Sequence, residues 1–299
     1  MAREIVMADV AAVKALLLRV LGSDEYNDIT RMGGLTNHTY KITLVNGEEY
    51  AVRLPGEGTE EMIVRSDERV STKLACDLGV DAELLYFDES GAKVTRFIPN
   101  AITMSASALR EPQHIEQIAA IFRTIHHCGV NTGVPFEVFA MAQNYEKIIL
   151  DKKVPMFEDY WEIKVEVLKI KEEIDNTFEV AKVPCHNDPL CENWVEGNGR
   201  MFLIDWEYAG MNDGMWDLAD VSIEAGFDDA CDKMLLRAYI GREPDVMEEK
   251  HFLASKIYVD FLWTLWAKAR VPYDGQPMED WAVERYMRMK SFIKAYQGL

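Results

Sequence analysis

The stretch V-P-C-H-N-D-P-L-C-E-N-W-V at residues 183–195, followed by M-F-L-I-D-W-E-Y-A-G-M-N-D-G-M-W-D-L-A at residues 201–219, organises the chain. Two short apolar runs, Trp194–Val195 and Met201–Ile204, flank a turn signal at Gly197-Asn198-Gly199. Such a pattern predicts a β-hairpin. The second strand then ends directly before Asp205, which places a carboxylate at the end of the hairpin.

Polar side chains of a particular chemistry surround this hairpin. His186, Asp188 and Asn193 come before or at its first strand, and Asp205 follows its second strand. Transfer of a phosphoryl group needs a carboxylate to orient the acceptor hydroxyl and accept its proton, and hard oxygen ligands to hold Mg²⁺. Asp188 suits the first role, and Asn193 with Asp205 suits the second. We expect His186 to brace the loop.

The order of these residues is typical of kinases. The pattern H-x-D-x-x-x-x-N followed by a strand-end Asp resembles the catalytic and metal-binding loops of protein kinases, with D-W-E in place of D-F-G. The run at residues 204–219 resembles the choline/ethanolamine kinase family, particularly bacterial choline kinases that supply phosphocholine for surface polysaccharides. A plain hairpin with acidic turns is the alternative. Four matched polar positions in order favour the kinase interpretation.

The resemblance implies a fold and an activity. The fold is α+β and protein-kinase-like, with a small sheet-based N-terminal lobe at residues 1–98 and a large, mainly helical C-terminal lobe at residues 99–299. The activity is ATP-dependent, Mg²⁺-assisted phosphorylation of choline to phosphocholine. Ethanolamine kinase, or an aminoglycoside or sugar kinase of the same fold, is the closest alternative, and a pseudokinase that binds without turnover is a less favoured one.

Composition limits the classes of partner. The chain has 32 basic and 51 acidic residues, so its formal net charge of −19 argues against a nucleic-acid binder. An acidic protein suits a cationic substrate, although acidity also serves solubility. Lys14 and Arg19 interrupt the apolar N-terminal run, which is wrong for a signal peptide or a membrane span, so we expect a cytoplasmic protein without a membrane partner. The five cysteines lack C-x-x-C spacing and are expected to be reduced.

The N-terminal third predicts a helix at residues 8–21 and then a series of strands. Expected strands cover residues 29–32, 38–45 and 48–54, with the Asn46-Gly47 dipeptide as a hairpin turn. The glycine pair between the first two strands lets backbone N–H groups approach a phosphate. We therefore expect the loop to bind ATP through Gly33, Gly34, Thr36 and Asn37, although an ordinary hairpin turn is the alternative.

Arg53 in Y-A-V-R-L stands where protein kinases carry the lysine of V-A-I-K, and choline kinases resemble this sequence in having arginine there. Arginine grips phosphate oxygens with a planar, permanently charged group. Glu68 lies within a predicted helix at residues 60–78 and is the candidate partner of Arg53, with Glu60, Glu61 and Asp67 as competitors. Both are assigned to ATP binding.

Two further strands are expected at residues 81–88 and 92–98, before Pro99-Asn100 breaks the pattern. This is the position of a kinase hinge. Arg96, Phe97 and Ile98 are therefore expected to offer backbone groups to the adenine, on the basis of their order along the chain alone.

The rest of the chain predicts helices at residues 112–128, 145–150, 160–174, 215–225, 248–270 and 278–296. The resemblance assigns Asp217 a structural role in supporting the catalytic loop by hydrogen bonds. It also matches Glu224 to an acidic residue of the substrate pocket.

Three tryptophans are candidates for the acceptor pocket. Trp263 and Trp266 share a helical face, and Trp281 belongs to the last helix. A quaternary ammonium group offers no N–H, so it is held by aromatic ring faces. We expect these rings, with Glu224 as counter-charge and Asp188 at the hydroxyl, to bind choline. Ordinary core packing is the alternative.

Overall fold

The computed structural model describes residues 7–32, 37–56 and 63–299. The chain divides into two compact units, each described separately below. The sheet unit comprises Met1–Met104 and Glu192–Ala209, and the helical unit comprises Ser105–Cys191 and Gly210–Leu299. The sheet unit therefore contains the hairpin at residues 194–203 in addition to the N-terminal segment that the sequence assigned to it.

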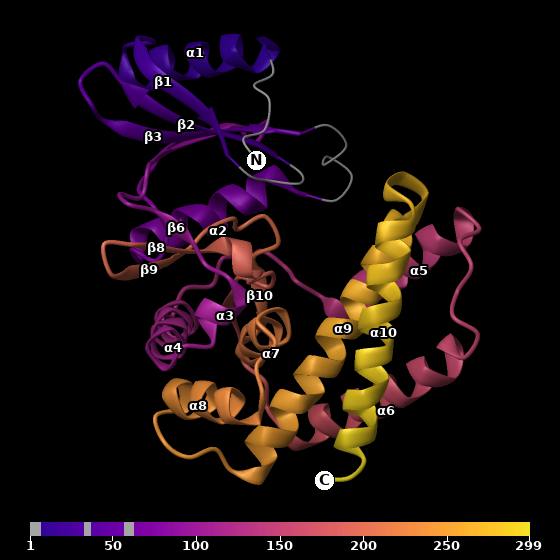
Figure 1. Cartoon of the computed structure of the whole chain (residues 1–299). Coiled ribbons are helices and arrows are strands. Elements are labelled where there is room, and N and C mark those ends of the chain that lie inside the picture. The colour runs from indigo at the N-terminus through magenta and orange to yellow at the C-terminus, as the bar shows by residue number, and fades with distance from the viewer. Residues whose placement is uncertain (1–6, 33–36, 57–62) are drawn as a thin grey trace. The chain divides into compact units, whose positions relative to one another are not determined.

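An antiparallel sheet of order β1-β2-β3-β5-β4 forms the first part of the sheet unit (Figure 1). The Asn46-Gly47 dipeptide forms the predicted turn between β2 and β3, and Gly47 adopts a φ of 85° that suits glycine. The helix α2 spans Arg65–Asp77. The strands are β1 (Tyr26–Arg31), β2 (Asn37–Leu44), β3 (Glu49–Pro55), β4 (Leu84–Phe87) and β5 (Lys93–Arg96).

Helix α1 (Met7–Leu21) covers one face of this sheet (Figure 1). Val13 and Leu17 are fully buried and belong to the same apolar cluster as Tyr40. Asp9 adds polar contacts, since its Oδ2 accepts a hydrogen bond from the Tyr40 hydroxyl at 2.6 Å and lies 2.7 Å from Nδ1 of His38. The helix thus completes the core of the sheet.

A second, three-stranded sheet of order β6-β8-β9 completes the sheet unit. The Leu203 N–H donates to the Val80 carbonyl at 3.0 Å, which ties the hairpin to the segment after α2. A Cβ atom at Gly197 would collide with the Ile98 side chain and would lie 2.9 Å from the Pro99 carbonyl oxygen. Only glycine therefore fits there. The strands are β6 (Ile102–Thr103), β8 (Trp194–Gly197) and β9 (Arg200–Leu203).

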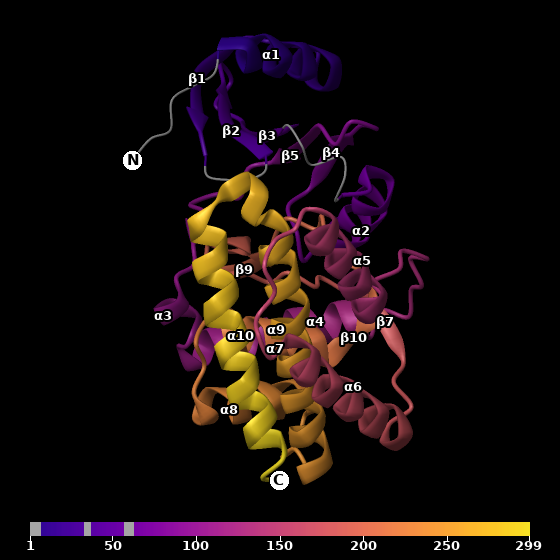
Figure 2. The same ribbon diagram turned by 90° about the vertical axis from the view of Figure 1, so that its right-hand side faces the viewer.

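The helical unit is organised around the long helix α9, against which α5, α7 and α10 pack (Figure 2). A short two-stranded sheet pairs β7 (Lys182–Cys185) with β10 (Gly210–Asp213). The helices are α3 (Ala106–Leu109), α4 (Pro112–His126), α5 (Val138–Asp151), α6 (Tyr160–Thr177), α7 (Gly214–Glu224), α8 (Asp229–Ile240), α9 (Val246–Asp274) and α10 (Gln276–Tyr296). A 3₁₀ turn at Cys191–Asn193 includes the last residue of the helical unit before the chain enters the sheet unit.

The α+β organisation predicted from the sequence is confirmed, with a sheet-rich N-terminal part and a helical C-terminal part. The hairpin at residues 194–203 is also confirmed. The sequence did not predict β6, β7, β10 or α8, and it began the helix α5 seven residues too late. No helix within the described ranges is both long and apolar enough to cross a bilayer.

Candidate active site

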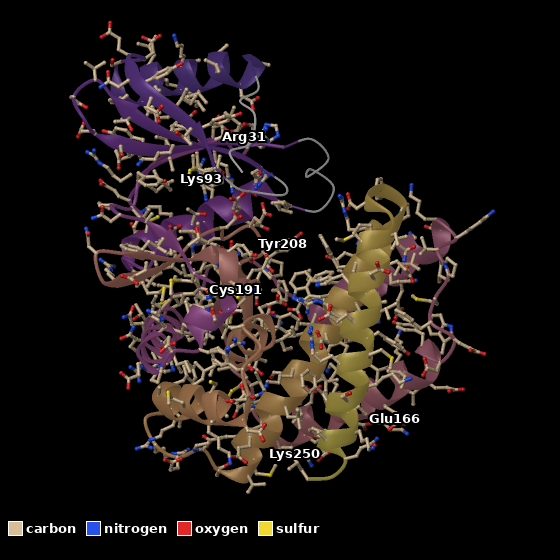
Figure 3. All side chains as sticks on the ribbon, in the orientation of Figure 1. Arg31, Lys93, Glu166, Cys191, Tyr208 and Lys250 are labelled. Atoms are coloured by element: carbon tan, nitrogen blue, oxygen red, sulfur yellow. The ribbon has the colours of Figure 1, made fainter. Side chains whose placement is uncertain are left out.

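A buried ion pair joins Arg53 of β3 to Glu68 of α2. Nη1 of Arg53 lies 2.5 Å from Oε1 of Glu68, and the two side chains are only 5% and 0% exposed. This is the pairing that the sequence suggested. Burial disfavours the charged carboxylate, but the positive charges of Arg53 and Lys93 hold the pKa of Glu68 below its ordinary value. Lys93, labelled in Figure 3, is the residue of β5 that pairs with Arg53 across the strands.

Arg53 also contacts the predicted metal ligand Asp205. Nη1 of Arg53 lies 3.3 Å from Oδ1 of Asp205, and Nη2 donates to the Gly91 carbonyl at 2.9 Å. Both terminal nitrogens of the guanidinium group therefore have protein partners. The structure gives Arg53 a positioning contact with Asp205, and its contact with phosphate stays a prediction.

Two residues that the sequence analysis did not select extend this network. Nη1 of Arg65 lies 2.6 Å from Oε2 of Glu68 and 3.5 Å from Oε2 of Glu207. Asn37, which was assigned to ATP binding, donates from Nδ2 to the same Glu207 oxygen at 3.0 Å. Glu207 is the Glu of D-W-E, so its place two residues after Asp205 was a signal in the sequence. Arg65 carried no such signal.

The carboxyl group of Glu207 has a perturbed pKa. Burial and the neighbouring charge of Asp205 raise the pKa of Glu207 to about 7. The Asp205 side chain is 36% exposed, whereas that of Glu207 is 7% exposed. Two carboxylates thus lie close together at the end of β9, one of them open to solvent.

Asn193 and Asp205 are held near each other by the hairpin itself. The Ile204 N–H donates to the Asn193 carbonyl at 2.9 Å. Asn193 is thus one partner of this backbone hydrogen bond, and Asp205 directly follows the other partner. Asp205 has a φ of 69°, in the left-handed region that Asp and Asn tolerate better than most residues. The structure therefore brings the backbone of the two residues close together, and their carboxamide and carboxylate groups are oxygen donors of the kind that suits Mg²⁺.

The predicted catalytic loop follows β7 in the helical unit, and Asp217 supports it. The carboxylate of Asp217 accepts the backbone N–H groups of His186 at 2.8 Å and Asn187 at 2.7 Å. This is the hydrogen-bonding role that the family resemblance suggested. His126 Nε2 lies 3.1 Å from the same carboxylate, so His126 belongs to the support of the loop, a contact that the sequence analysis did not predict.

Side chains within the loop hold its shape. Asn187 has a φ of 67°, and its side-chain carbonyl accepts from Asn212 Nδ2 at 2.9 Å. His186 is fully buried, and its Nδ1 accepts the Asp188 N–H at 3.3 Å. His186 thus contacts the backbone of the loop, as a bracing residue would. Asp188 is half-buried.

The three predicted cage tryptophans come together in the helical unit. The rings of Trp263 and Trp266 have centroids 6.3 Å apart, and those of Trp266 and Trp281 lie 5.9 Å apart, both pairs edge to face. Trp216 extends the row, 6.5 Å from Trp263. The helices α9 and α10 therefore bring the three rings together, whereas a role in binding choline stays a prediction.

Glu224 lies beside this cluster, but it already has a positive partner. Its Oε1 forms an ion pair with Nη2 of Arg285, and the Arg285 guanidinium group stacks 4.2 Å from the centroid of Trp281. Arg285 is buried and was not selected from the sequence. The carboxylate that we reserved for the substrate is thus engaged with a residue of the protein.

The predicted nucleotide contacts are less well defined. Gly33, Gly34 and Thr36 lie outside the described residues. The Arg96 and Phe97 N–H groups donate to Glu83 and Glu49 carbonyls, so these two donors are used inside the sheet. Ile98 packs with Ala82 and Val195 in a small buried cluster. The N–H groups of Arg96 and Phe97 are therefore not free to bind adenine, and the rest of the hinge assignment stays a prediction.

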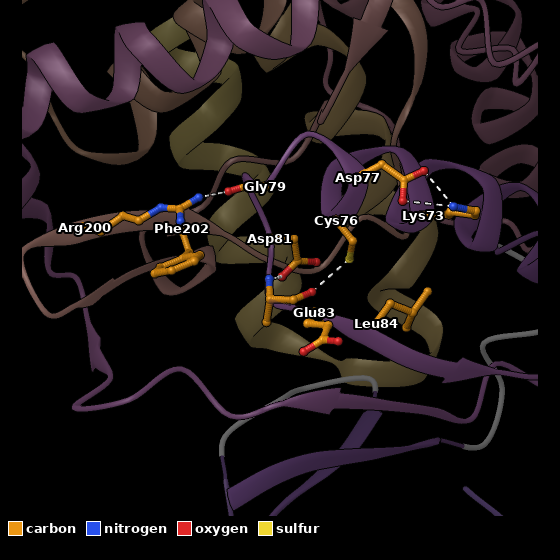
Figure 4. Close-up of a pocket in the computed structure, with 10 residues that line it drawn as sticks. Lys73, Cys76, Asp77, Gly79, Asp81, Glu83, Leu84, Arg200 and Phe202 are labelled. Atoms are coloured by element: carbon orange, nitrogen blue, oxygen red, sulfur yellow. Dashed lines mark hydrogen bonds and ion pairs between the residues drawn. The ribbon is translucent and has the colours of Figure 1, made fainter.

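A cavity of about 410 Å³ opens elsewhere in the sheet unit, between the end of α2 and β9 (Figure 4). Asp81, Cys76 and Phe202 are among its lining residues, and none of the predicted site residues is. Burial raises the pKa of Asp81 to about 6, although its Oδ1 accepts the Ala82 N–H at 2.6 Å. We assign no catalytic role to this cavity.

His126, Cys185 and Asp217 form a close buried group in which the potential ligand atoms all lie within 4.8 Å of one another. Asp217 already accepts two backbone hydrogen bonds and contacts His126. Burial raises the pKa of the Cys185 thiol well above its ordinary value, which disfavours the thiolate that a metal requires. We interpret the group as structural support for the loop.

The chain is similar to known proteins over most of its length. A sequence profile described as choline/ethanolamine kinase matches residues 29–267. The chain belongs to the choline/ethanolamine kinase family. The kinase is therefore a phosphotransferase that acts on an alcohol group of a small molecule, and its protein-kinase-like fold is confirmed.

Solved structures resemble the kinase over nearly its whole length. A choline/ethanolamine kinase family protein from Mesorhizobium loti is 32% identical and covers 96% of this chain and 95% of its own, with a TM-score of 0.84. The choline kinase LicA from Streptococcus pneumoniae is 30% identical over 97% of this chain and 100% of its own, with a TM-score of 0.83. The structure of a LicA complex with AMP is 30% identical and covers 96% of this chain and 98% of its own, with a TM-score of 0.78.

Proposed function

We propose that this kinase transfers the γ-phosphoryl group of ATP to the hydroxyl group of choline. The main support is the row of tryptophans in the helical unit, because ring faces are what a trimethylammonium group requires. The similarity to the LicA choline kinase supports the same substrate, and the LicA complex with AMP supports an adenine nucleotide. A cytoplasmic location, where ATP is available, is part of the proposal.

Asp188 is the proposed base. In this role its carboxylate orients the choline hydroxyl and accepts its proton as the oxygen attacks the phosphorus. Asp217 positions the loop through the N–H groups of His186 and Asn187, and the ring of His186 accepts the N–H of Asp188. These contacts hold the backbone that leads into the base.

Asn193 and Asp205 are the proposed magnesium ligands. Their oxygen donors fit this cation, and a bound cation would favour the ionised form of Glu207, whose pKa burial and the neighbouring Asp205 raise to about 7. When bound, Mg²⁺ would neutralise charge on the ATP phosphates. Arg53 holds the Asp205 carboxylate from one side, and the Glu68 carboxylate in turn holds Arg53.

Ethanolamine is the second candidate acceptor, and one observation favours it. Oδ1 of the buried Asp220, on α7, has no hydrogen-bond partner within the described structure, and a primary ammonium group would supply one. The tryptophan rings, in contrast, would leave the N–H donors of ethanolamine without hydrogen-bond acceptors, and this favours choline.

A coupled assay of ADP release with choline, ethanolamine and an aminoglycoside as acceptors tests the proposal. We expect the highest kcat/KM with choline. A higher kcat/KM with ethanolamine would show that ethanolamine, and not choline, is the preferred acceptor. Turnover of the aminoglycoside alone would exclude both choline and ethanolamine as acceptors.

A further inference from the structure

Asp220 is a fully buried carboxyl group on α7, beside the tryptophan row. Its Oδ2 accepts a hydrogen bond from Nε1 of Trp263 at 3.3 Å. Its Oδ1 is buried without a hydrogen-bond partner in the part of the chain that the structure describes. Burying a carboxylate oxygen without a partner is costly, so this oxygen needs an explanation, and a bound ligand is one.

The charges around Asp220 do not balance. Arg285 of α10 pairs with Glu224 and lies 3.0 Å from Oδ1 of Asp260 on α9. Arg288 contacts both oxygens of Asp260, at 2.7 and 2.8 Å. If all three carboxyl groups were ionised, Asp220, Glu224 and Asp260 would carry three negative charges against the two positive charges of Arg285 and Arg288, and one negative charge would be left without a partner.

The contacts of the three carboxyl groups show which one has no arginine partner. Glu224 and Asp260 each pair with arginine, whereas the Asp220 carboxyl group accepts a hydrogen bond from the neutral indole of Trp263. The other helices packed on α7 do not compensate it. His126 of α4 contacts Asp217, and Lys256 of α9 pairs with Asp232 of α8.

We propose that Asp220 is the negative charge that receives the cationic head group of the substrate, and that its carboxyl group releases a proton to solvent as the cation binds. The inference rests on the proposed function, since it concerns the same substrate. It differs from the sequence-based assignment of the counter-charge, because Glu224 is held by Arg285.

A proton is the natural occupant of this carboxyl group before the substrate arrives. Burial first, and then the negative charge of Glu224, raise the pKa of Asp220 well above its ordinary value, while Arg285 and Trp263 act in the opposite direction. Asp217 adds a smaller raising effect. Binding of a cation favours the ionised form, so binding and deprotonation are coupled. The KM for choline should therefore fall as the pH rises. It should become constant once the pH is high enough for Asp220 to be ionised in the free enzyme.

Calorimetry on the unmodified protein tests the coupling directly. Choline and its uncharged isostere 3,3-dimethylbutan-1-ol would be titrated in two buffers that differ in their enthalpy of ionisation. We expect proton release with choline and none with the isostere. Choline binding without proton release would overturn the inference, even if choline is turned over normally.

Two variants of equal shape separate Asp220 from Glu224. Asp220→Asn keeps an acceptor for Trp263 and should raise the KM for choline by about tenfold or more, leave the KM for ATP unchanged and abolish the pH dependence of the choline KM. Glu224→Gln should keep that pH dependence but shift it to lower pH, because the main charge that raises the pKa of Asp220 is removed. The reverse pattern would assign the counter-charge to Glu224. Absence of any turnover of choline or ethanolamine by the unmodified kinase would instead contradict the proposed function.

Discussion

The guanidinium group of Arg53 lies 2.5 Å from the Glu68 carboxylate, and neither side chain is exposed by more than 5%. Through the same Nη1 atom Arg53 also contacts Asp205, at 3.3 Å. A helix residue far from the hairpin in sequence is thereby linked to a proposed metal ligand, so stability and activity should both depend on it.

Replacing Glu68 with Gln should strongly destabilise the protein. Arg53 and Arg65 would lose their shared negative partner, and removing one member of a buried ion pair costs about 3–5 kcal/mol. Urea unfolding would measure the loss. Asp77→Asn is a matched control on the same helix, because the Lys73–Asp77 pair is exposed and should contribute less than about 1 kcal/mol. Equal effects of the two variants would contradict the interpretation of the Arg53–Glu68 pair.

Replacing Asp188 with Asn should lower kcat by roughly 10²- to 10⁴-fold, because the variant cannot accept the hydroxyl proton. The melting temperature should change little, since Asp188 is half-buried. Asp205→Asn should also lose most of kcat, and asparagine tolerates the left-handed backbone at this position. Asp175→Asn, at an exposed carboxylate of α6, is the control and should be fully active. Near-normal turnover of either active-site variant would refute its assigned role.

Activity should require Mg²⁺, with Mn²⁺ as a workable substitute, because the proposed ligands are hard oxygen donors. Excess EDTA should abolish ADP release, and added Mg²⁺ should restore it. A chelator selective for zinc should have no effect, since the buried His126, Cys185 and Asp217 group is interpreted as structural. Inhibition by the zinc chelator would indicate that the His126, Cys185 and Asp217 group binds a metal ion.

Replacing Trp266 with Leu should raise the KM for choline by roughly two- to thirtyfold, as expected for the loss of one ring around a desolvated cation. The KM for ATP should stay close to that of the unmodified kinase. Trp266 is half-buried and its Nε1 has no hydrogen-bond partner in the described structure, so the substitution breaks no hydrogen bond. A large drop in melting temperature with equal effects on both substrates would show that the tryptophans are only core.

Replacing Asp81 with Asn should stabilise the kinase at high pH. Because burial raises the pKa of Asp81 to about 6, ionising it in the folded protein costs free energy. That cost is absent at pH values below the unfolded pKa, grows as the pH rises and is complete above about 6. Asparagine keeps an acceptor for the Ala82 N–H.

The free energy of unfolding of the Asp81 variant and the unmodified kinase should be compared at pH 5 and pH 8. We expect the difference to move by roughly 1–2 kcal/mol in favour of the variant at the higher pH. A difference that does not change with pH would show that Asp81 ionises normally in the cavity.

The sequence predicted those elements whose formation depends on turn residues and on the spacing of apolar residues within one segment. The glycine-containing turn between Trp194 and Leu203 gave the hairpin, and helical periodicity gave α9 and α10 with their tryptophans. The pairing of Arg53 with Glu68 was predictable because a known kinase arrangement relates a strand to the following helix. The short strands β7 and β10 were missed because each has four residues and pairs with a distant segment.

The parts of the site that were missed depend on contacts distant in sequence. Arg285 is 61 residues from Glu224, and no pattern within either helix shows that their side chains form an ion pair. Asp220 has the same limitation, because its unpaired oxygen is visible only when all neighbouring charges are placed. Arg65 resembles any other helical arginine until Glu207 is found beside it.

Gly197 has a consequence for how the kinase tolerates genetic change. Its absent side chain is the space that Ile98 and the Pro99 carbonyl occupy, whereas Gly199, two residues on, has nothing within 4 Å of its hypothetical Cβ. Any larger residue at Gly197 would displace the strand that begins after Asn193. In a saturation library selected for growth that depends on this enzyme, position 197 should be depleted as severely as Asp188, although it touches no substrate.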